Sequence, residues 1–318
     1  MSLLVAPGLL AHPAACRAHP ALVRFAAYAT PPQLEPEGLA MLVCGLLAGL
    51  GARPVGALAA LGTGLPAESE YWLVADPVSL AAGRSDIVLA GRVADLTPED
   101  TEELLLALNG HFHDDGLSFV APRPDLWLAH LTETPLLVTH ALDHAASRGL
   151  AAALPAGEAG PQWRRWQDEM QMLLHAHPVN DGREAAGALP ANAVWVWGGG
   201  RLADAGPVSH IEVSAPAGLL GDMLDGLALL GQAHAEPGSA ARHVEVGPVI
   251  QDEAAAAAFL DATLAPALAR LERGTLRELT LVADGNGMAA AWLARPPSRW
   301  QRLGARWRAQ PFVVPATA

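Results

Sequence analysis

Residues 175–200, HAHPVNDGREAAGALPANAVWVWGGG, carry the densest group of polar side chains in the chain and join two regular elements. Upstream, residues 161–176 repeat large apolar side chains at helical spacing, which predicts a long helix with one face in a core. Downstream, residues 193–197 are an apolar run that predicts a buried strand leading into three glycines. Because Pro178 breaks the helix, we expect a polar loop between the two elements.

Four side chains of this loop are the candidate ligand contacts: His177, Asn180, Arg183 and Asn192. Arginine forks onto a carboxylate or phosphate and asparagine donates hydrogen bonds, so this set suits a small anionic oxygen ligand. The alternative interpretation is structural. In that case the two asparagines close turns, and Arg183 pairs with Glu184 or with solvent. The residues alone favour the structural interpretation.

Strand and helix patterns alternate after residue 190, and a short apolar strand at residues 2–5 opens the chain. This alternation predicts the α/β class, with a mostly parallel sheet flanked by helices. The further elements expected are strands at residues 211–213, 243–246 and 278–283 and helices at residues 218–230 and 252–271.

The middle of the chain predicts a smaller α+β unit. Short strand patterns surround a helix that begins at Thr97, which can cap it, with Pro98 and two acidic residues in the first turn. Residues 51–66 are rich in Gly and Pro and mark the first boundary. The expected division is a core of residues 1–65 and 191–318 and a separate domain of residues 66–190.

Composition narrows the function. The chain has 318 residues and a formal net charge of −13, so it lacks the basic surface with which proteins bind nucleic acid. The two cysteines, Cys16 and Cys44, cannot form a disulfide framework, which favours the reducing cytoplasm. The apolar run at residues 39–50 is shorter than the roughly 20 residues that a membrane span needs. We therefore expect a buried helix there and no membrane insertion.

Other motifs carry less chemistry. The histidine pairs at positions 111 and 113 and at 175 and 177 lie at predicted helix ends, where residues two apart diverge, so capping or surface roles are favoured over metal binding. Asp284-Gly-Asn-Gly287 follows a predicted strand and indicates a hairpin turn. The sequence has no G-x-S-x-G nucleophile elbow, no P-loop and no C-x-x-C pair.

The string His177-Pro-Val-Asn-x-x-Arg-x-x-x-Gly-x-x-Pro-Ala-Asn192, followed by Trp195-x-Trp-Gly198, resembles a hallmark of archaeal-type cofactor-independent phosphoglycerate mutases. These enzymes belong to the alkaline phosphatase superfamily. The resemblance implies an alkaline-phosphatase-like α/β core into which residues 66–190 are inserted as a smaller α+β domain.

Three further strings resemble a proteobacterial group, the regulatory proteins of RpfE type, whose members are often labelled as phosphoglycerate mutases. These strings are Trp72-Leu-x-Ala-Asp-Pro-Val78, Leu108-Asn-x-His-Phe112 and Glu169-Met-Gln-Met-x-x-His175. Together with the motif at residues 177–198, they extend the likeness over most of the chain.

The same resemblance implies where a working mutase would hold two metal ions and a serine nucleophile. The strand at residues 2–5 should be followed by an aspartate, but Val5-Ala-Pro-Gly-Leu-Leu10 has no carboxylate. Gly247-Pro-Val-Ile-Gln-Asp252 lacks the expected histidine, and only Asp284 stands where an Asp-His pair is expected. Two divalent ions need several carboxylates and imidazoles, so these departures predict a protein without metal or cofactor.

Three functions follow as hypotheses. The first is a catalytically degenerate, phosphoglycerate-mutase-like regulator that binds a small phosphorylated or carboxylate ligand or a protein partner. The second is an active metal-dependent mutase or phosphatase. The third is a structural or interaction protein with no small ligand and an exposed apolar patch. For the second, the candidate ligands of Mn or Mg are Asp76, His111, His113 and Asp284.

Overall fold

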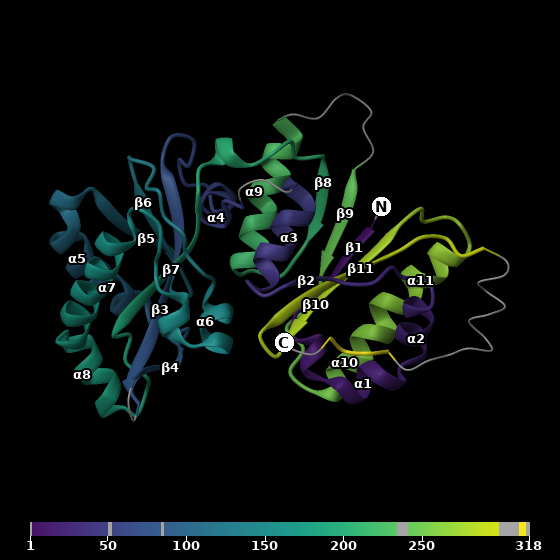
Figure 1. The fold of residues 1–318 in the computed structure, drawn as a ribbon, viewed down its shortest axis with the longest axis horizontal. Coiled ribbons are helices and arrows are strands. Elements are labelled where there is room, and N and C mark those ends of the chain that lie inside the picture. The colour runs from purple at the N-terminus through teal and green to yellow at the C-terminus, as the bar shows by residue number, and fades with distance from the viewer. Residues whose placement is uncertain (1, 50–52, 84–85, 234–240, 299–311, 316–318) are drawn as a thin grey trace. The chain divides into compact units, whose positions relative to one another are not determined.

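A computed structural model describes residues 2–49, 53–83, 86–233, 241–298 and 312–315 of the chain (Figure 1). The chain divides into two compact units. The first unit is Met1–Leu47, Pro207–Ala217 and Leu230–Ala318, and the second is Ala48–Gly206 and Gly218–Leu229. Each unit combines helices with its own sheet, so the fold is mixed α/β.

The first unit is built on a six-stranded sheet. In spatial order its strands are β2 (Gln33–Glu35), β11 (Met288–Ala294), β10 (Leu279–Gly285), β1 (Ser2–Ala6), β9 (Arg242–Val246) and β8 (Ile211–Ser214). Strand β1 pairs in parallel with β9 and β10, and β8 pairs in parallel with β9, whereas β11 is antiparallel to β10 and β2. The carboxyl ends of β1, β9 and β10 therefore meet at one edge of the sheet, where the motif resemblance expects metal ligands.

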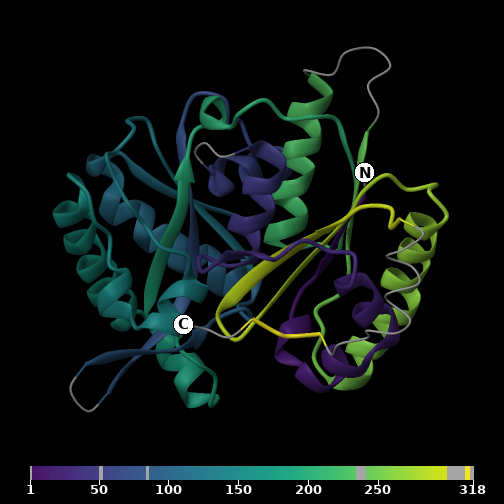
Figure 2. The same ribbon diagram turned by 45° about the vertical axis from the view of Figure 1, so that its right-hand side comes forward.

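Short helices pack with this sheet into one apolar core (Figure 2). They are α1 (Pro13–Ala18), α2 (Pro20–Ala26), α10 (Glu253–Phe259) and α11 (Ala265–Glu272), the last two joined by a π-helical turn, Leu260–Leu264. Phe25, Leu264 and Leu281 are among the side chains that this core encloses. The alternation predicted at the carboxyl-terminal part of the chain is thus present, and β2 and β11 add two antiparallel strands that it did not predict.

Among the described residues, one helical stretch, Glu253–Glu272, is long and apolar enough to cross a membrane by length and composition. Its Phe259, Leu264 and Leu268 belong to the core of the first unit, as in a core helix. The predicted apolar helix is α3, Leu39–Ala48, which is 10 residues long. Its Leu42, Val43 and Cys44 are completely buried, so the expected buried helix is confirmed.

The second unit is built on a five-stranded antiparallel sheet. Its strands are β3 (Tyr71–Ala82), β4 (Ile87–Arg92), β5 (Leu117–Arg123), β6 (Leu126–Leu131) and β7 (Ala193–Gly200). Strand β3 is central: β7 follows one edge of it, while β6 and then β4 share the other edge. Since β3 is paired on both edges, it fixes the positions of the polar side chains that it carries.

Helices cover this second sheet. α5 (Pro98–Phe112) and α7 (Gly160–His175) enclose an apolar core with it, in which Trp166 makes T-shaped contacts with Phe112 and Trp163. The predicted apolar stripe of α7 is therefore core, and Thr97 caps α5 as expected by accepting a hydrogen bond from the Asp100 amide. The remaining helices are α4 (Val55–Gly62), α6 (Leu142–Arg148), α8 (Pro178–Ala185) and α9 (Leu219–Ala233).

The division into units differs from the expected limits at residues 65 and 190. Strand β7 lies in the second sheet, and the Gly- and Pro-rich residues expected to mark a boundary contain α4, which packs on β3 and β7. The glycines are the physical reason. A Cβ atom at Gly62 would lie 1.9 Å from the Asp222 carbonyl oxygen, and one at Gly226 would lie 2.0 Å from that of Leu58. Glycine thus permits close packing of α4 against the first part of α9, rather than marking a loop.

Candidate functional site

The predicted polar loop contains a helix. α8 begins directly after His177, whose Nδ1 accepts a hydrogen bond from the Val179 amide at 3.3 Å. Pro178 occupies the first helical position, where its missing N–H removes no helical hydrogen bond. His177 therefore acts as the N-cap of α8, and the proline that interrupts one helix starts the next.

Asn180 is 2% exposed, and all the polar atoms of its side chain bind backbone. Its Nδ2 donates to the carbonyl oxygens of Leu174 at 2.7 Å and Ala191 at 3.0 Å, and its Oδ1 accepts from the Ala191 amide at 2.8 Å. One side chain thus ties the end of α7 to the residues that lead into β7. These are the contacts that the structural interpretation of the loop requires.

Asn192 extends a strand ladder. Its Oδ1 accepts from the amide of Leu80 at 2.8 Å and its Nδ2 donates to the carbonyl oxygen of Leu80 at 2.9 Å. The side-chain amide therefore pairs with β3 as a backbone peptide would, next to the register pair Val78 and Ala193. Both asparagines of the candidate site hold backbone segments together.

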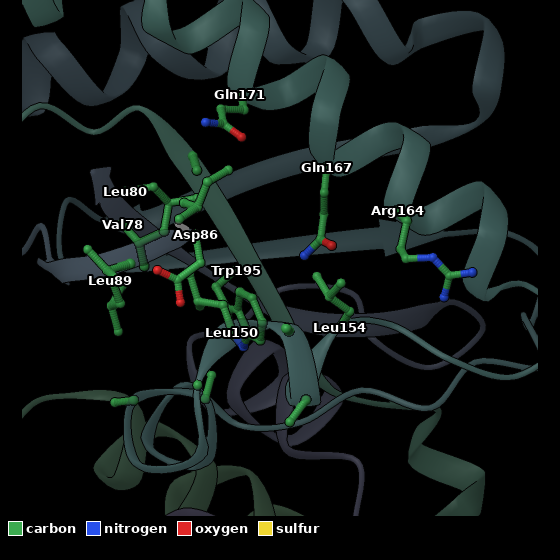
Figure 3. A pocket seen from close by; sticks show the side chains of 18 of the residues that line it. Val78, Leu80, Asp86, Leu89, Leu150, Leu154, Arg164, Gln167, Gln171 and Trp195 are labelled. Atoms are coloured by element: carbon green, nitrogen blue, oxygen red, sulfur yellow. The ribbon is translucent and has the colours of Figure 1, made fainter. Parts of the chain in front are cut away.

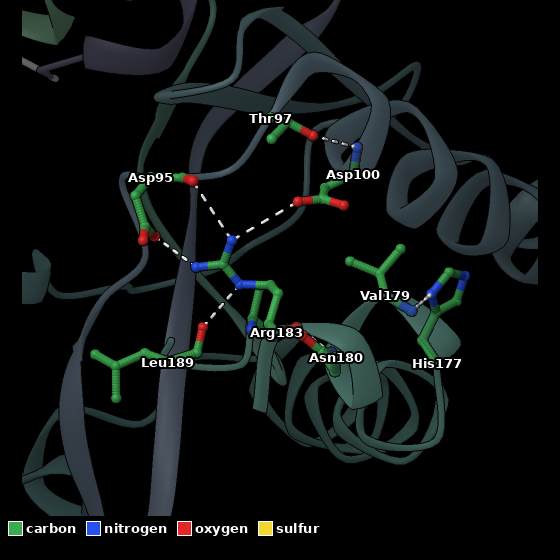
Figure 4. A network of polar contacts seen from close by, with 9 residues as sticks. Asp95, Thr97, Asp100, His177, Val179, Asn180, Arg183 and Leu189 are labelled. Carbon is green, nitrogen blue, oxygen red and sulfur yellow. Dashed lines mark hydrogen bonds and ion pairs between the residues drawn. The ribbon is translucent and has the colours of Figure 1, made fainter. Parts of the chain in front are cut away.

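Arg183 is surrounded by protein acceptors (Figure 4). Its Nε donates to the carbonyl oxygen of Leu189 at 2.9 Å, and its Nη2 contacts the Asp95 carboxylate at 2.5 Å. The Asp100 carboxylate lies 3.7 Å from Nη1. Arg183 thus pairs with Asp95 and Asp100, and the shallow groove that it lines also contains Glu103. An anion could reach this guanidinium only by displacing carboxylates.

The four predicted contacts are close in the chain but do not converge on one cavity among the described residues. Arg183 lines the acidic groove, whereas His177 lines a separate depression with His111 and Glu169. His111 Nε2 lies 3.1 Å from the Glu169 carboxylate. One histidine of the pair at positions 111 and 113 therefore already has an acidic partner.

The carboxyl edge of the first sheet is closed by direct contacts between its loops. The backbone amide of Gly8, after β1, donates to Oδ1 of Asp284, at the end of β10, across 2.7 Å. The Ile250 amide, after β9, donates to the Pro7 carbonyl oxygen at 2.8 Å. Gly8 has a φ of +81°, and a Cβ atom there would lie 2.6 Å from the Ile250 carbonyl oxygen. Here glycine is needed both for its conformation and for its small size.

The hairpin predicted at residues 284–287 is confirmed. Gly285 pairs with Met288 across a two-residue turn, in which Asn286 and Gly287 have φ values of +54° and +74°. Two successive left-handed residues are typical of the hairpin turn favoured by Asn-Gly. Among the described residues, none of Asp76, His111, His113 and Asp284 belongs to a group of three side chains close enough to share a metal ion.

A second polar site, not predicted as a group, lies on β3, β4 and β7. Asp76 is 4% exposed, and its Oδ2 accepts a hydrogen bond from the indole Nε1 of Trp197 at 2.7 Å. Its Oδ1 forms an ion pair with Nη2 of Arg92. A buried carboxylate needs such partners, because desolvation of an unpaired charge is strongly unfavourable.

The charges around Arg92 are coupled to Asp143 of α6. Burial lowers the pKa of Arg92, but Asp76, Asp143 and Asp125 oppose this effect and leave the pKa raised. Burial raises the pKa of Asp143, Arg92 lowers it and Asp76 raises it further, so the pKa is raised on balance. The Arg92 side chain keeps 40% of its surface exposed. Asp76 and Trp197 stand in the strings quoted above, and an aspartate in an apolar strand is itself a signal, since strands disfavour Asp. Arg92 had no such signal in the sequence.

Comparison with known proteins gives a fold likeness at low identity. No family model matches the chain, and no curated protein matches it. The cofactor-independent phosphoglycerate mutase from Thermoplasma acidophilum is 15% identical, with 94% of this chain and 90% of that chain covered and a TM-score of 0.39. The PH0037 protein from Pyrococcus horikoshii is 13% identical, with 94% and 88% covered and a TM-score of 0.43.

Proposed function

We propose that this chain is a phosphoglycerate-mutase-like protein without metal-dependent phosphotransfer, which acts by binding a small phosphorylated or carboxylate ligand. The bond between Gly8 and Asp284 carries this proposal. It employs the Asp284 carboxylate as a backbone acceptor, at the edge where the motif resemblance expects a two-metal centre, and the other carboxylate of the three loops, Asp252, accepts from the Ala255 amide as the cap of α10. A pair of divalent ions there would need more anionic ligands than these loops supply.

Arg92 is the proposed contact for the ligand. Its ion pair with Asp76, which is itself held by Trp197, orients the guanidinium from a central strand. Arginine has five N–H donors in a planar fork, so an ion pair through Nη2 leaves donors for a carboxylate or phosphate. The exposed part of the side chain gives a ligand access that the enclosed Arg183 lacks.

The loop at residues 177–192 then serves mainly to position the sheet. Asn180 and Asn192 attach the start of β7 to α7 and β3, and β7 in turn carries Trp197. Ligand binding by His177, Asn180, Arg183 and Asn192 is the competing assignment. It requires an anion to replace the Asp95 carboxylate on Arg183.

A regulatory role, as in the RpfE-type group that the three sequence strings resemble, is part of the same proposal. A protein without phosphotransfer chemistry can regulate by changing its conformation when a ligand binds, or by binding a protein partner. The proposal includes no cofactor, whereas the alternative, an active mutase or phosphatase, would require Mn or Mg.

Calorimetric titration with 3-phosphoglycerate, and separately with inorganic phosphate, in metal-free buffer tests the proposal. We expect binding to the unaltered chain and a loss of about ten-fold or more in Arg92→Gln, since a charge-assisted hydrogen bond contributes about 1.5–3 kcal/mol. Arg92→Lys keeps a cation beside Asp76 but lacks the fork, so it reports on binding if the glutamine variant fails to fold. Arg164→Gln, at an exposed arginine of α7, is the matched control.

The outcomes separate the assignments. Binding that is lost in the Arg92 variants and retained in Arg183→Lys supports the proposal. Binding that survives in Arg92→Gln and disappears in Arg183→Lys assigns the ligand to the loop instead. Absence of binding of both probes to the folded, unaltered chain overturns the proposal and favours an interaction protein.

A further inference from the structure

The second unit contains a cavity of about 760 Å³ that is separate from the Arg92 site, since Arg92 does not line it (Figure 3). It lies among α7, the start of β7, the β3–β4 hairpin and the segment after α6. Its volume falls in the range of roughly 300–1,000 Å³ that is typical of small-molecule sites.

The wall of this cavity is aliphatic and aromatic. Val78, Val194 and Trp195 are buried in the sheet, and Leu154 stands at the mouth with 40% of its surface exposed. The indole Nε1 of Trp195 donates to the His140 carbonyl oxygen at 2.8 Å, so the only polar atom of this ring is already bonded. The wall therefore offers an apolar surface to a ligand.

One polar atom in the wall lacks a partner. The side chain of Gln167, on α7, points into the cavity in Figure 3, and its Oε1 is buried with no hydrogen-bond partner. A buried carbonyl oxygen without a donor is unfavourable by about 1–3 kcal/mol, so a ligand that supplies an O–H or N–H group there gains affinity. This acceptor distinguishes the cavity from a simple packing defect.

The charged side chains around the cavity do not favour a charged ligand. Among the residues that the structure describes, its charged lining side chains are two arginines and two aspartates, Arg148, Arg164, Asp86 and Asp168, and all four are exposed. Arg164 also donates to the Pro155 carbonyl oxygen at 2.5 Å. Since the charges of opposite sign balance, the lining favours a neutral ligand over an anion or a cation.

We propose that this cavity is a second binding site, for a neutral small molecule with an apolar body and one hydrogen-bond donor that is received by Oε1 of Gln167. An aliphatic alcohol represents this class of ligand: its chain contacts Val78, Val194 and Trp195, and its hydroxyl group donates to Gln167. The site is independent of anion binding at Arg92.

Saturation-transfer NMR with 1-octanol and with its methyl ether, which has the same chain and no donor, tests the site. We expect the alcohol to bind about three- to ten-fold more tightly than the ether, the range for one net hydrogen bond. Gln167→Leu should remove this difference while leaving binding of the ether. Leu154→Trp should block the mouth and abolish both signals, whereas Leu106→Trp, at an exposed leucine of α5 outside the cavity, should leave them unchanged.

Several results would overturn the proposal. They are absence of alcohol binding to the folded chain, equal affinity for alcohol and ether, tighter binding of octanoate than of octanol, and equal binding by the two tryptophan variants. Arg92→Gln should bind 1-octanol normally, so failure of anion binding and failure of this site are distinguishable. Circular dichroism of each variant confirms that the fold is intact.

Discussion

The Asp284 carboxylate accepts a hydrogen bond from the backbone amide of Gly8 across 2.7 Å, which joins the end of β10 to the end of β1. These strands are parallel neighbours, with Ala6 opposite Ala283, so their following loops begin at the same edge. A side chain at the position of Gly8 would strike the Ile250 carbonyl oxygen. Backbone contacts and the Asp284 carboxylate thus hold the loops of this edge together.

Replacing Asp284 should affect stability rather than metal content. Asp284→Ala leaves the Gly8 amide without this acceptor, and we expect the free energy of unfolding to fall by about 1–2 kcal/mol in urea titrations. Asp284→Asn keeps an oxygen acceptor and should lose less. If bound Mn or Mg is found in the unaltered chain and disappears in Asp284→Asn, the residue is a metal ligand and our interpretation is wrong.

Asn180 should be among the most sensitive positions of the second unit. Asn180→Ala removes three hydrogen bonds to backbone and takes from the Ala191 amide and carbonyl groups the Asn180 partner of each, whereas the Leu174 carbonyl oxygen keeps the His177 amide. We expect a loss of at least about 2 kcal/mol in the free energy of unfolding. Glu184→Ala, at an exposed residue of the same helix, is the control and should change it by less than about 0.5 kcal/mol. Similar effects for the two variants would contradict the structural role of Asn180.

The thiol of Cys16 should be inert in the folded chain. Burial first, and then the charge of Glu253, raise its pKa from 9.0 to about 11. A thiol reagent at pH 8 should therefore label Cys16 only after unfolding, and Cys44, which is also completely buried, should behave alike. Rapid labelling of the native protein would show that the helices around Cys16 open.

The same shift predicts a pH dependence of stability. The folded state holds the Cys16 proton more tightly than the unfolded state, so this contribution is fully present below pH 9 and is lost as the pH rises toward about 11. Cys16→Ser should reduce the dependence over that interval. An unchanged slope in the variant would assign the dependence to other groups.

The charge of Arg92 should influence the pKa of Asp143. Because Arg92 lowers the pKa of Asp143, Arg92→Gln should raise that pKa further and move the carboxyl titration, followed by NMR, to higher pH. Arg164→Gln is the matched control, because Arg164 is not among the groups that shift this pKa. A downward movement in Arg92→Gln would contradict the charge arrangement of the site.

Much of the fold could be predicted because single elements carry periodic patterns. The apolar stripe of α7, the cap at Thr97 and the Asn286-Gly287 turn each depend on residues close in sequence. The sheet to which β7 belongs could not be predicted, since an apolar strand has no local feature that selects its partner. The glycines of α4 indicated a domain boundary, whereas they permit close contact with a helix that is distant in the sequence.

The candidate site was harder to predict than the fold. The types of Asn180, Arg183 and Asn192 were informative, but a sequence does not show whether their polar atoms face backbone or a ligand. The partner of Arg183 is Asp95, which lies 88 residues away in the chain rather than next to it. Arg92 and Asp76 are likewise paired by the register of β3 and β4, which periodicity alone does not define.

A coupled assay for conversion of 3-phosphoglycerate to 2-phosphoglycerate, with added manganese and with metal-free controls, tests the central claim most directly. The folded protein should give no turnover above the metal-free background, even where calorimetry shows that it binds 3-phosphoglycerate. Manganese-dependent turnover by the unaltered chain would contradict the loss of phosphotransfer and would require metal ligands beyond the loops joined by Gly8 and Asp284.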